Sequence, residues 1–142
     1  MIKAKHYLNQ IRRLNTMILN KRIEKEQWWE AATKTTSSFG GDRVQSSGSK
    51  QKMADAVGEY VDIGRRIDEC IMEMEKAKQD IIHTIEQLPV DEYDVLHKHY
   101  VQGLSLMEVA EVKEKSYSLI TTVHGRALKK VQAILDSRKE QR

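Results

Sequence analysis

The positions of the apolar residues along this chain predict helices almost throughout. Between residues 2 and 34, apolar side chains recur at alternating spacings of four and three, the repeat of a coiled-coil seam. Lys21 and Lys25 then occupy seam positions before Trp28, so the apolar stripe thins towards its end. We therefore predict one long helix over residues 2–34, with these seam positions: Tyr7, Ile11, Leu14 and Ile18.

A second stretch, residues 53–88, carries the longest repeat of spacings three and four. A helix with such a stripe must pair in water. The first helix can fold back on it across residues 35–52, which have no period and collect Ser, Gly and Thr, as flexible connections do. The sequence thus predicts a coiled-coil-like antiparallel hairpin over residues 1–88. The predicted seam of the second helix is Val57, Tyr60, Gly64, Ile67, Ile71, Met74, Lys78, Ile81, Ile85 and Leu88.

Two features of this hairpin have alternative explanations. Apolar residues at positions 63, 67, 70, 74, 81 and 82 suggest a face wider than a hairpin needs, and we expect a homodimer; a hairpin alone is the alternative. Trp28 and Trp29 either cover the end of the hairpin core, which we favour, or form an exposed anchor for a partner.

The C-terminal part begins at Pro89, which stops the second helix. Asp91 and Glu92 open a helix over residues 91–102, because acidic side chains suit a helix N-terminus. Gly103 ends this helix as a C-cap. Its predicted buried residues are Tyr93, Leu96 and Tyr100.

Residues 103–131 then predict two helices joined by a tight turn. Ser105 and Glu108 have the spacing of a capping box, which marks the start of the first. Leu106, Val109 and Ala110 face inward, and Ser116 is the N-cap of the second. The turn between them comprises residues 112–115. The inward residues of the second helix are Ile120, Val123, Ala127, Leu128 and Val131.

A helix, a tight turn and a second helix form the helix-turn-helix pattern, in which the second helix can enter a DNA major groove. Tyr117, Ser118, Thr121 and Thr122 point outward at its beginning, and all four can hydrogen-bond to base edges. Basic residues follow one to two turns later, where a helix runs beside phosphates. The predicted DNA-binding residues are Ser116, Tyr117, Ser118, Thr121, Thr122, Arg126, Lys129 and Lys130.

The distribution of charge is uneven along the 142 residues. Residues 1–36 hold eight basic and three acidic residues, and residues 57–115 hold seven basic and fourteen acidic ones. Residues 116–142 hold six basic and two acidic residues. A basic end after an acidic middle favours a polyanionic partner, although a solvated helix face explains the same charges about as well.

Several classes of protein are disfavoured by the sequence. The single cysteine, Cys70, excludes an internal disulfide framework and a cysteine-based zinc site, and its apolar neighbours predict burial. The five histidines have no metal-ligand spacing. No catalytic triad or phosphate-binding loop is present, so we expect neither an enzyme nor a cofactor. Without a signal peptide or an apolar run of roughly 20 residues, we expect a cytoplasmic protein with no membrane association.

The C-terminal part contains the run Leu96-His97-Lys98-His99-Tyr100, Gly103-Leu104-Ser105, Glu108-Val109-Ala110, Ser116 and His124 to Val131. This run resembles region 4 of sigma factors. More closely, residues 88–135 resemble the small phage and prophage regulators of the RinA/ArpU type. The resemblance implies regulation of late-operon transcription in a bacterial host by promoter binding, with RNA polymerase as a further partner. By position it places Tyr117, Ser118 and Thr122 at base edges, and Thr121, Arg126 and Lys130 at the backbone.

The chain departs from the family pattern in the turn, where Lys113 and Glu114 replace an apolar residue and Gly. Glu114 must then adopt the turn conformation at a cost of about 1 kcal/mol. The outward start of the second helix also lacks an Arg or Lys, and Leu119 replaces a polar residue.

The sequence thus predicts an all-α protein with a helical hairpin over residues 1–88 and a helix-turn-helix domain over residues 89–142. We interpret it as a regulator that binds double-stranded DNA. Two alternatives remain: a protein-interaction module that binds RNA polymerase, and a phage DNA-packaging or structural helical protein.

Overall fold

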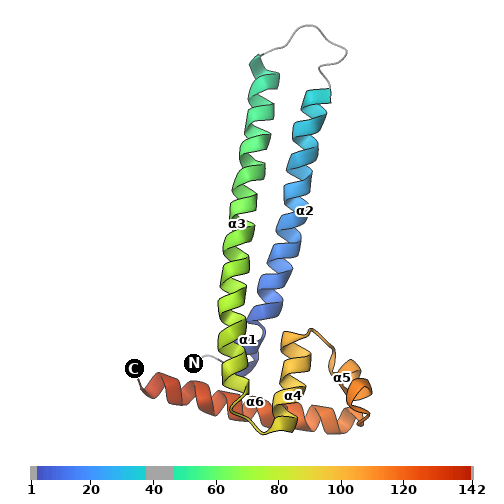
Figure 1. Ribbon diagram of the computed structural model, residues 1–142, viewed down its shortest axis with the longest axis vertical. Coiled ribbons are helices and arrows are strands. Elements are labelled where there is room, and N and C mark those ends of the chain that lie inside the picture. Colours follow the sequence, from blue (N-terminus) through green and yellow to red (C-terminus); the bar gives the residue numbers. More distant parts are fainter. Residues whose placement is uncertain (1–2, 38–46, 142) are drawn as a thin grey trace. The chain divides into compact units, whose positions relative to one another are not determined.

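The computed structural model describes residues 3–37 and 47–141, and this part of the chain contains six α-helices, one π-helical turn and no strand (Figure 1). The predicted all-α class is confirmed. No helix within these residues is long and apolar enough to cross a membrane. The elements are α1 (Ala4–Leu8), α2 (Gln10–Ser37), α3 (Ser47–Ile85), α4 (Val90–Leu96), η2 (His97–Val101), α5 (Leu106–Lys113) and α6 (Tyr117–Glu140).

The chain forms two compact units: residues 15–73, and residues 1–14 together with 74–142. These boundaries do not coincide with the predicted division at residue 88, because the end of α3 shares a core with the C-terminal helices. Ile81, Ile85 and Leu88 pack in one buried cluster with Leu96 and Val131. The polypeptide on both sides of Pro89 therefore belongs to a single core.

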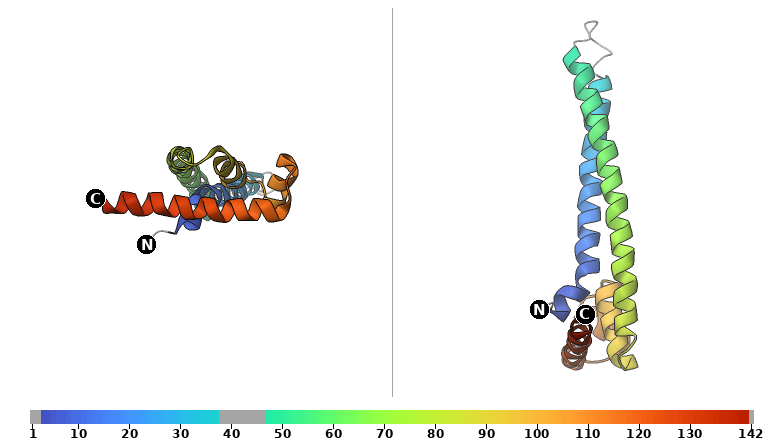
Figure 2. Two further views of the ribbon diagram at one scale, coloured as in Figure 1. Left: turned by 90° about the horizontal axis from the view of Figure 1, so that it is seen from below. Right: turned by 90° about the vertical axis from the view of Figure 1, so that its left-hand side faces the viewer.

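Within residues 15–73, the segments of α2 and α3 lie side by side in both directions of view (Figures 1 and 2). The Trp29 and Tyr60 ring centroids are 5.5 Å apart, and the Lys25 ammonium nitrogen lies 4.7 Å from the Tyr60 ring centroid. The prediction for Cys70 is confirmed, since its side chain is buried. The buried apolar residues of this unit are Ile18, Ala32, Ala56, Ile63, Ile67 and Cys70.

The predicted seam of the second helix is wrong at three positions of its first half, whereas Ile81, Ile85 and Leu88 in its second half are buried as predicted. Ile67 is buried as expected, but Val57 is 44% exposed, while Ala56 is buried in its place. In the same way Ile63 and Cys70 are buried, whereas Gly64 and Ile71 are only partly buried. A shift of one residue rotates a side chain by about 100° on a helix, so between residues 56 and 70 the true seam runs along the neighbouring stripe. Positions 63, 67, 70 and 81 are thus buried within one chain. They no longer widen the face that suggested a homodimer.

The two tryptophans only partly match the explanation we favoured. Trp29 contacts Tyr60, yet it remains 55% exposed, and Trp28 is 37% exposed. The ring of Trp29 therefore covers the hairpin core with one side and leaves the other side free.

The predicted single helix over residues 2–34 is interrupted at Asn9, between α1 and α2. Asn9 donates its backbone N–H to the Lys5 carbonyl, and the Gln10 side chain donates to the Tyr7 carbonyl at 2.9 Å, which satisfies the end of α1. The break allows α1 to pack against α6 with Ala4, Tyr7 and Leu8 buried. The seam residues Tyr7, Ile11, Leu14 and Ile18 are all buried, as predicted.

Other predicted boundaries shift by several residues. Helix α2 continues to Ser37 and α3 begins at Ser47, so the expected connection over 35–52 is helical at both ends. Its central part, residues 38–46, lies outside the described residues. Helix α3 ends at Ile85 rather than at 88, and the expected helix 91–102 is α4 followed by the π-helical turn η2. Leu96 and Tyr100 are buried as predicted, whereas Tyr93 is only partly buried.

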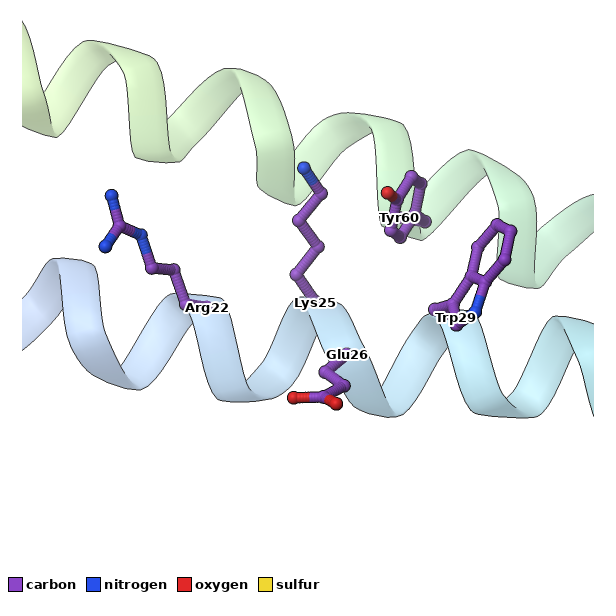
Figure 3. Close-up of a pocket in the computed structure, with 5 residues that line it drawn as sticks. All are labelled: Arg22, Lys25, Glu26, Trp29 and Tyr60. Carbon is purple, nitrogen blue, oxygen red and sulfur yellow. The ribbon is translucent and has the colours of Figure 1, made fainter.

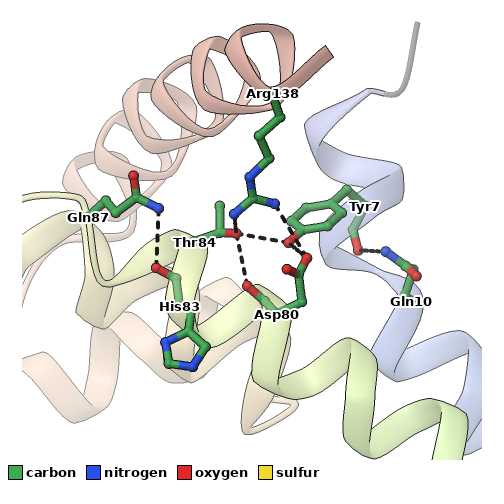
Figure 4. A network of polar contacts seen from close by, with 7 residues as sticks. All are labelled: Tyr7, Gln10, Asp80, His83, Thr84, Gln87 and Arg138. Carbon is green, nitrogen blue, oxygen red and sulfur yellow. Dashed lines mark hydrogen bonds and ion pairs between the residues drawn. The ribbon is translucent and has the colours of Figure 1, made fainter. Parts of the chain in front are cut away.

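A polar network fixes the far end of α6 within the unit formed by residues 1–14 and 74–142 (Figure 4). The Tyr7 hydroxyl donates to Asp80 and lies 2.9 Å from the Thr84 hydroxyl. Arg138 donates to the Thr84 oxygen at 2.6 Å and lies 3.5 Å from an Asp80 carboxylate oxygen. Burial, together with the hydrogen bond to Asp80, raises the pKa of Tyr7. This network ties together α1, α3 and α6.

Candidate nucleic-acid interface

Local hydrogen bonds define where α5 begins and ends. The Ser105 hydroxyl accepts from the Glu108 N–H at 3.1 Å, and the Glu108 carboxylate accepts from the Ser105 N–H at 3.3 Å. This reciprocal pair is the predicted capping box, which is therefore confirmed. Before it, Gly103 has a φ of +82°, a left-handed conformation that glycine adopts without strain.

The turn between α5 and α6 is formed without glycine. Glu114 has φ 54° and ψ 44°, which confirms that it takes the left-handed conformation predicted for it. Its N–H donates to the Glu111 carbonyl at 3.2 Å, and the Lys115 N–H donates to the Ala110 carbonyl at 3.0 Å. Ser116 then caps α6 by accepting from the Leu119 N–H at 3.1 Å. The strain of Glu114 is thus offset by satisfied backbone groups at both ends of the turn.

A small core holds α5 and α6 together. It consists of one residue from α4 and two each from α5 and α6, and Leu104 and Leu106 pack against it. Ala110 is 5% exposed, and its short side chain allows α6 to approach α5 closely. The inward residues predicted for both helices are buried or partly buried, as expected. The members of this core are Val95, Val109, Ala110, Ile120 and Val123.

The first turns of α6 expose most of the predicted base-contacting side chains. Tyr117 is 52% exposed, Ser118 and Thr122 are exposed, and Thr121 is partly buried. The Thr121 and Thr122 hydroxyls donate to the Ser118 carbonyl at 2.8 and 3.0 Å. Their oxygen atoms can still accept a hydrogen bond, but donation to a base would require each hydroxyl to leave this backbone contact.

Two of the predicted backbone-contacting cations are bound to a buried carboxylate of α4. The Lys130 ammonium nitrogen lies 3.0 and 2.9 Å from the two Glu92 carboxylate oxygens, and the Arg126 Nε lies 3.9 Å from one of them. Glu92 is only 5% exposed, whereas Arg126 and Lys130 reach solvent. Lys129, on the neighbouring face, is exposed. Together with the Arg138–Asp80 pair, these contacts neutralise part of the positive charge of residues 116–142.

Glu92 is a residue whose role the sequence interpretation missed. We expected it only to favour the start of a helix. Lys130 is 38 residues away in sequence, so no local spacing announces their contact. One feature of the sequence could have indicated that Glu92 is buried. Glu92 lies three and four residues before Val95 and Leu96, which are both fully buried, and that spacing places it on the inward face of α4.

A second carboxylate, Asp94, fixes the turn against α4. It accepts from Lys98 and from Lys113, each at 2.5 Å. Burial disfavours the ionised form, but the hydrogen bonds from the two lysines outweigh it and lower the pKa of Asp94. Lys113, which replaces an apolar residue of the family pattern, therefore holds the end of α5 to α4.

The histidines near α6 form a structural cluster that the sequence did not reveal. The Tyr100 hydroxyl lies 2.7 Å from the His124 Nε2, and His99 Nδ1 lies 2.6 Å from the Leu104 carbonyl oxygen. His124 is 8% exposed. Burial, with a smaller contribution from His99, lowers the pKa of His124 from 6.5 to about 4, and burial raises that of Tyr100 to about 12. Both groups are neutral near pH 7, and their contact joins η2 to α6.

No metal site is apparent in the described part of the chain, since it contains no cluster of three histidine, cysteine, aspartate or glutamate residues suited to an ion. A hollow beside the start of α6 has a mixed lining instead. Lys113, Lys115 and Arg126 stand around it with Asp91 and the apolar Leu119. Leu119 is 45% exposed, so an apolar group lies among cations on this surface.

Comparison with known proteins gives no relative: no family model, curated protein or solved structure matches this chain. The resemblance to sigma region 4 and to RinA/ArpU-type regulators therefore stays a prediction from the quoted residues.

Proposed function

We propose that this protein is a DNA-binding transcriptional regulator of the prophage late-operon or sigma-like kind. The observation that carries the proposal is the capped α5–turn–α6 segment. Its second helix presents Tyr117, Ser118 and Thr122 at an exposed N-terminal end, with cations one to two turns further on. A recognition helix uses the same order, in which N-terminal residues meet base edges and later ones meet phosphates.

The proposed contacts are of two kinds, those with base edges and those with phosphates. Tyr117, Ser118 and Thr122 offer hydroxyl groups to base edges, and the exposed side chain of Leu119 suits the methyl group of thymine. Lys129 faces solvent and suits a phosphate directly. Arg126 and Lys130 reach phosphates only by sharing or leaving Glu92, so we expect a shallower dependence on salt than their number alone suggests.

We further propose that the protein acts as a homodimer. A dimer would present two α6 helices to two half-sites, which multiplies the sequence read by one short helix. With two lysines, one arginine and few hydroxyl groups per interface, a single copy would have modest specificity.

The first experiment is a selection of phage and host genomic fragments on the purified full-length protein, at low and near-physiological salt. A regulator enriches one promoter-proximal sequence, and the enrichment survives the higher salt because base contacts release no counterions. Unselective binding that disappears with salt would contradict the proposal, since phosphate attraction alone behaves in this way.

Two substitutions separate the proposed roles. Arg126→Ala should weaken binding to every sequence alike and reduce the slope of log K against log salt by up to about one. Lys139→Ala, an exposed site at the far end of α6, removes the same charge and is its control. Equal effects of the two variants would remove Arg126 from the interface.

Thr122→Ala should instead reduce the discrimination between the selected sequence and its single-base variants by about 1 kcal/mol at one position. Thr33→Ala is the matched control, because that exposed threonine also donates its hydroxyl to a backbone carbonyl of its own helix. A variant that keeps the full preference would exclude Thr122 from base recognition.

A second candidate function, binding to RNA polymerase, is favoured by the apolar surface of the same segment. Met107 is 61% exposed, Val112 is 59% exposed and Leu119 is 45% exposed. Charged substitutions at Met107 and Val112, which lie on α5, should leave DNA selection unchanged. Loss of polymerase binding with intact DNA selection would support this role, and a loss of DNA selection would place α5 in the DNA interface instead.

A further inference from the structure

One side of the unit formed by residues 15–73 carries apolar side chains that the unit itself does not cover. On α2, positions 19, 22, 26 and 29 are spaced by three or four residues and form one stripe. On α3, positions 57, 61, 64, 68 and 71 form a second stripe with the same spacings. The large apolar members are exposed: Leu19 by 50%, Trp29 by 55%, Val57 by 44% and Val61 by 51%.

The two stripes share one side of the helix pair. Arg22, Lys25, Glu26, Trp29 and Tyr60 line one shallow hollow (Figure 3), which places three members of the α2 stripe together. Lys25 reaches towards α3 and lies next to Gly64, where an added Cβ would be 3.3 Å from its ammonium nitrogen. Gly64 belongs to the α3 stripe, so this stripe borders the same hollow. We call these two stripes the apolar face.

The α2 stripe, and on α3 the two ends of the stripe, are self-complementary when the apolar face is reversed end to end. On α2, Leu19 and Trp29 lie equally far from position 24, and so do Arg22 and Glu26. On α3, Val57 and Ile71 lie equally far from Gly64. Positions 24 and 64 are at nearly one level of the pair, since Lys25 meets Gly64 and Trp29 meets Tyr60.

We propose that the apolar face binds a second copy of this chain, antiparallel, about a two-fold axis close to Gly64. An interface with two-fold symmetry uses one patch twice, so each residue on one side of the axis must suit its mirror position. Here Leu19 meets Trp29 of the other copy, and Val57 meets Ile71. Gly64 lies close to the axis, where its missing side chain leaves room for the Lys25 ammonium group of the same copy.

Charge gives the orientation of the two copies. In the antiparallel arrangement, Arg22 of each copy lies opposite Glu26 of the other, which forms two ion pairs of opposite charge. A parallel arrangement would lose both pairs. The inference concerns residues 15–73 alone and does not depend on DNA binding.

The test is a charge exchange between two full-length variants, with molecular mass measured by sedimentation equilibrium. Arg22→Glu carries two acidic residues at these positions, and Glu26→Arg carries two basic ones. Each variant alone should dimerise at least about tenfold more weakly than the wild type, because like charges then face each other. An equimolar mixture should restore a dimer of twice 16.5 kDa, since acidic and basic copies pair at both positions.

Arg65→Glu and Glu69→Arg provide the matched control. This pair has the same i, i+4 spacing on α3, and both residues are exposed outside the two stripes. These variants should dimerise like the wild type, and circular dichroism should show equal helicity throughout, which excludes loss of folding. A monomeric wild type, or a mixture of Arg22→Glu and Glu26→Arg that stays monomeric, would overturn the proposal. Two single variants that remain dimeric would overturn it as well, because the interface would then lie elsewhere.

Discussion

The burial of His124 beside Tyr100 makes the stability of the protein sensitive to mild acid. Burial lowers the pKa of His124 from 6.5 to about 4. Below pH 6.5 the unfolded chain binds a proton at this residue, whereas the folded chain does not until the pH reaches about 4. Stability is therefore lost as the pH falls through this range, and no further loss from this group follows below it.

The size of the effect follows from the two pKa values. Between pH 7 and pH 5, the linkage relation gives a loss of about 2 kcal/mol in the free energy of unfolding. The ion pair of Asp94 contributes little in this window, because its carboxyl has a lowered pKa and stays ionised in both states near pH 5. His99 acts in the same direction as His124, since burial lowers its pKa as well.

The measurement is urea-induced unfolding at pH 7 and pH 5, followed by circular dichroism. His124→Gln places an amide near the Tyr100 hydroxyl without a titrating group, so this variant should lose about 2 kcal/mol less than the wild type between the two pH values. His83→Gln, at an exposed position of α3, should retain the wild-type difference. An equal pH dependence in His124→Gln and wild type would refute the assignment of the acid sensitivity to buried His124.

Two further substitutions test the turn and its neighbouring carboxylate. Glu114→Gly should stabilise the protein by about 1 kcal/mol in urea unfolding, because glycine adopts a φ of 54° without steric strain; an unchanged or lower stability would show that the Glu114 side chain contributes a compensating contact. Glu92→Gln removes the charge that holds Arg126 and Lys130, so it should tighten DNA binding at low salt and steepen the salt slope by about one. Weaker binding by this variant, measured by fluorescence anisotropy, would mean that Glu92 positions these cations for phosphates instead of competing with them.

The capped ends of α5 and α6 could be predicted from the sequence because their determinants are local. Ser105 and Glu108 are three residues apart, and Ser116 directly precedes its helix, so their hydrogen bonds depend on the helix geometry alone. The conformation of Glu114 followed from the tightness of the turn in the same way. The inward and outward positions of α6 could also be predicted, because a periodic apolar stripe along a capped helix determines both of its faces.

The contacts that restrain the cations of α6 could not be predicted, because each of them joins distant parts of the chain. Arg138 binds Thr84 across 54 residues, and Lys130 binds Glu92 across 38. A sequence shows the sign of these charges but not their partners. The predicted basic end was therefore correct in composition and overestimated as a free electrostatic surface.

The misplaced seam of α3 has a similar origin and a consequence for association. A helix with apolar residues at both positions 56 and 57, and at both positions 70 and 71, offers two overlapping stripes, and the spacing of three and four fits both. The structure chooses the stripe of Ile63 and Cys70 for the hairpin core, which leaves Val57 and Ile71 at its border. The apolar residues that first suggested a dimer thus fall into two stripes of α3. One stripe is used within the chain, and the other belongs to the apolar face proposed to meet a second copy. Truncation of core residues would unfold the hairpin, whereas Arg22 and Glu26 lie on the exposed apolar face. Charge exchange at these two residues is therefore a sharper test of association than truncation of the core.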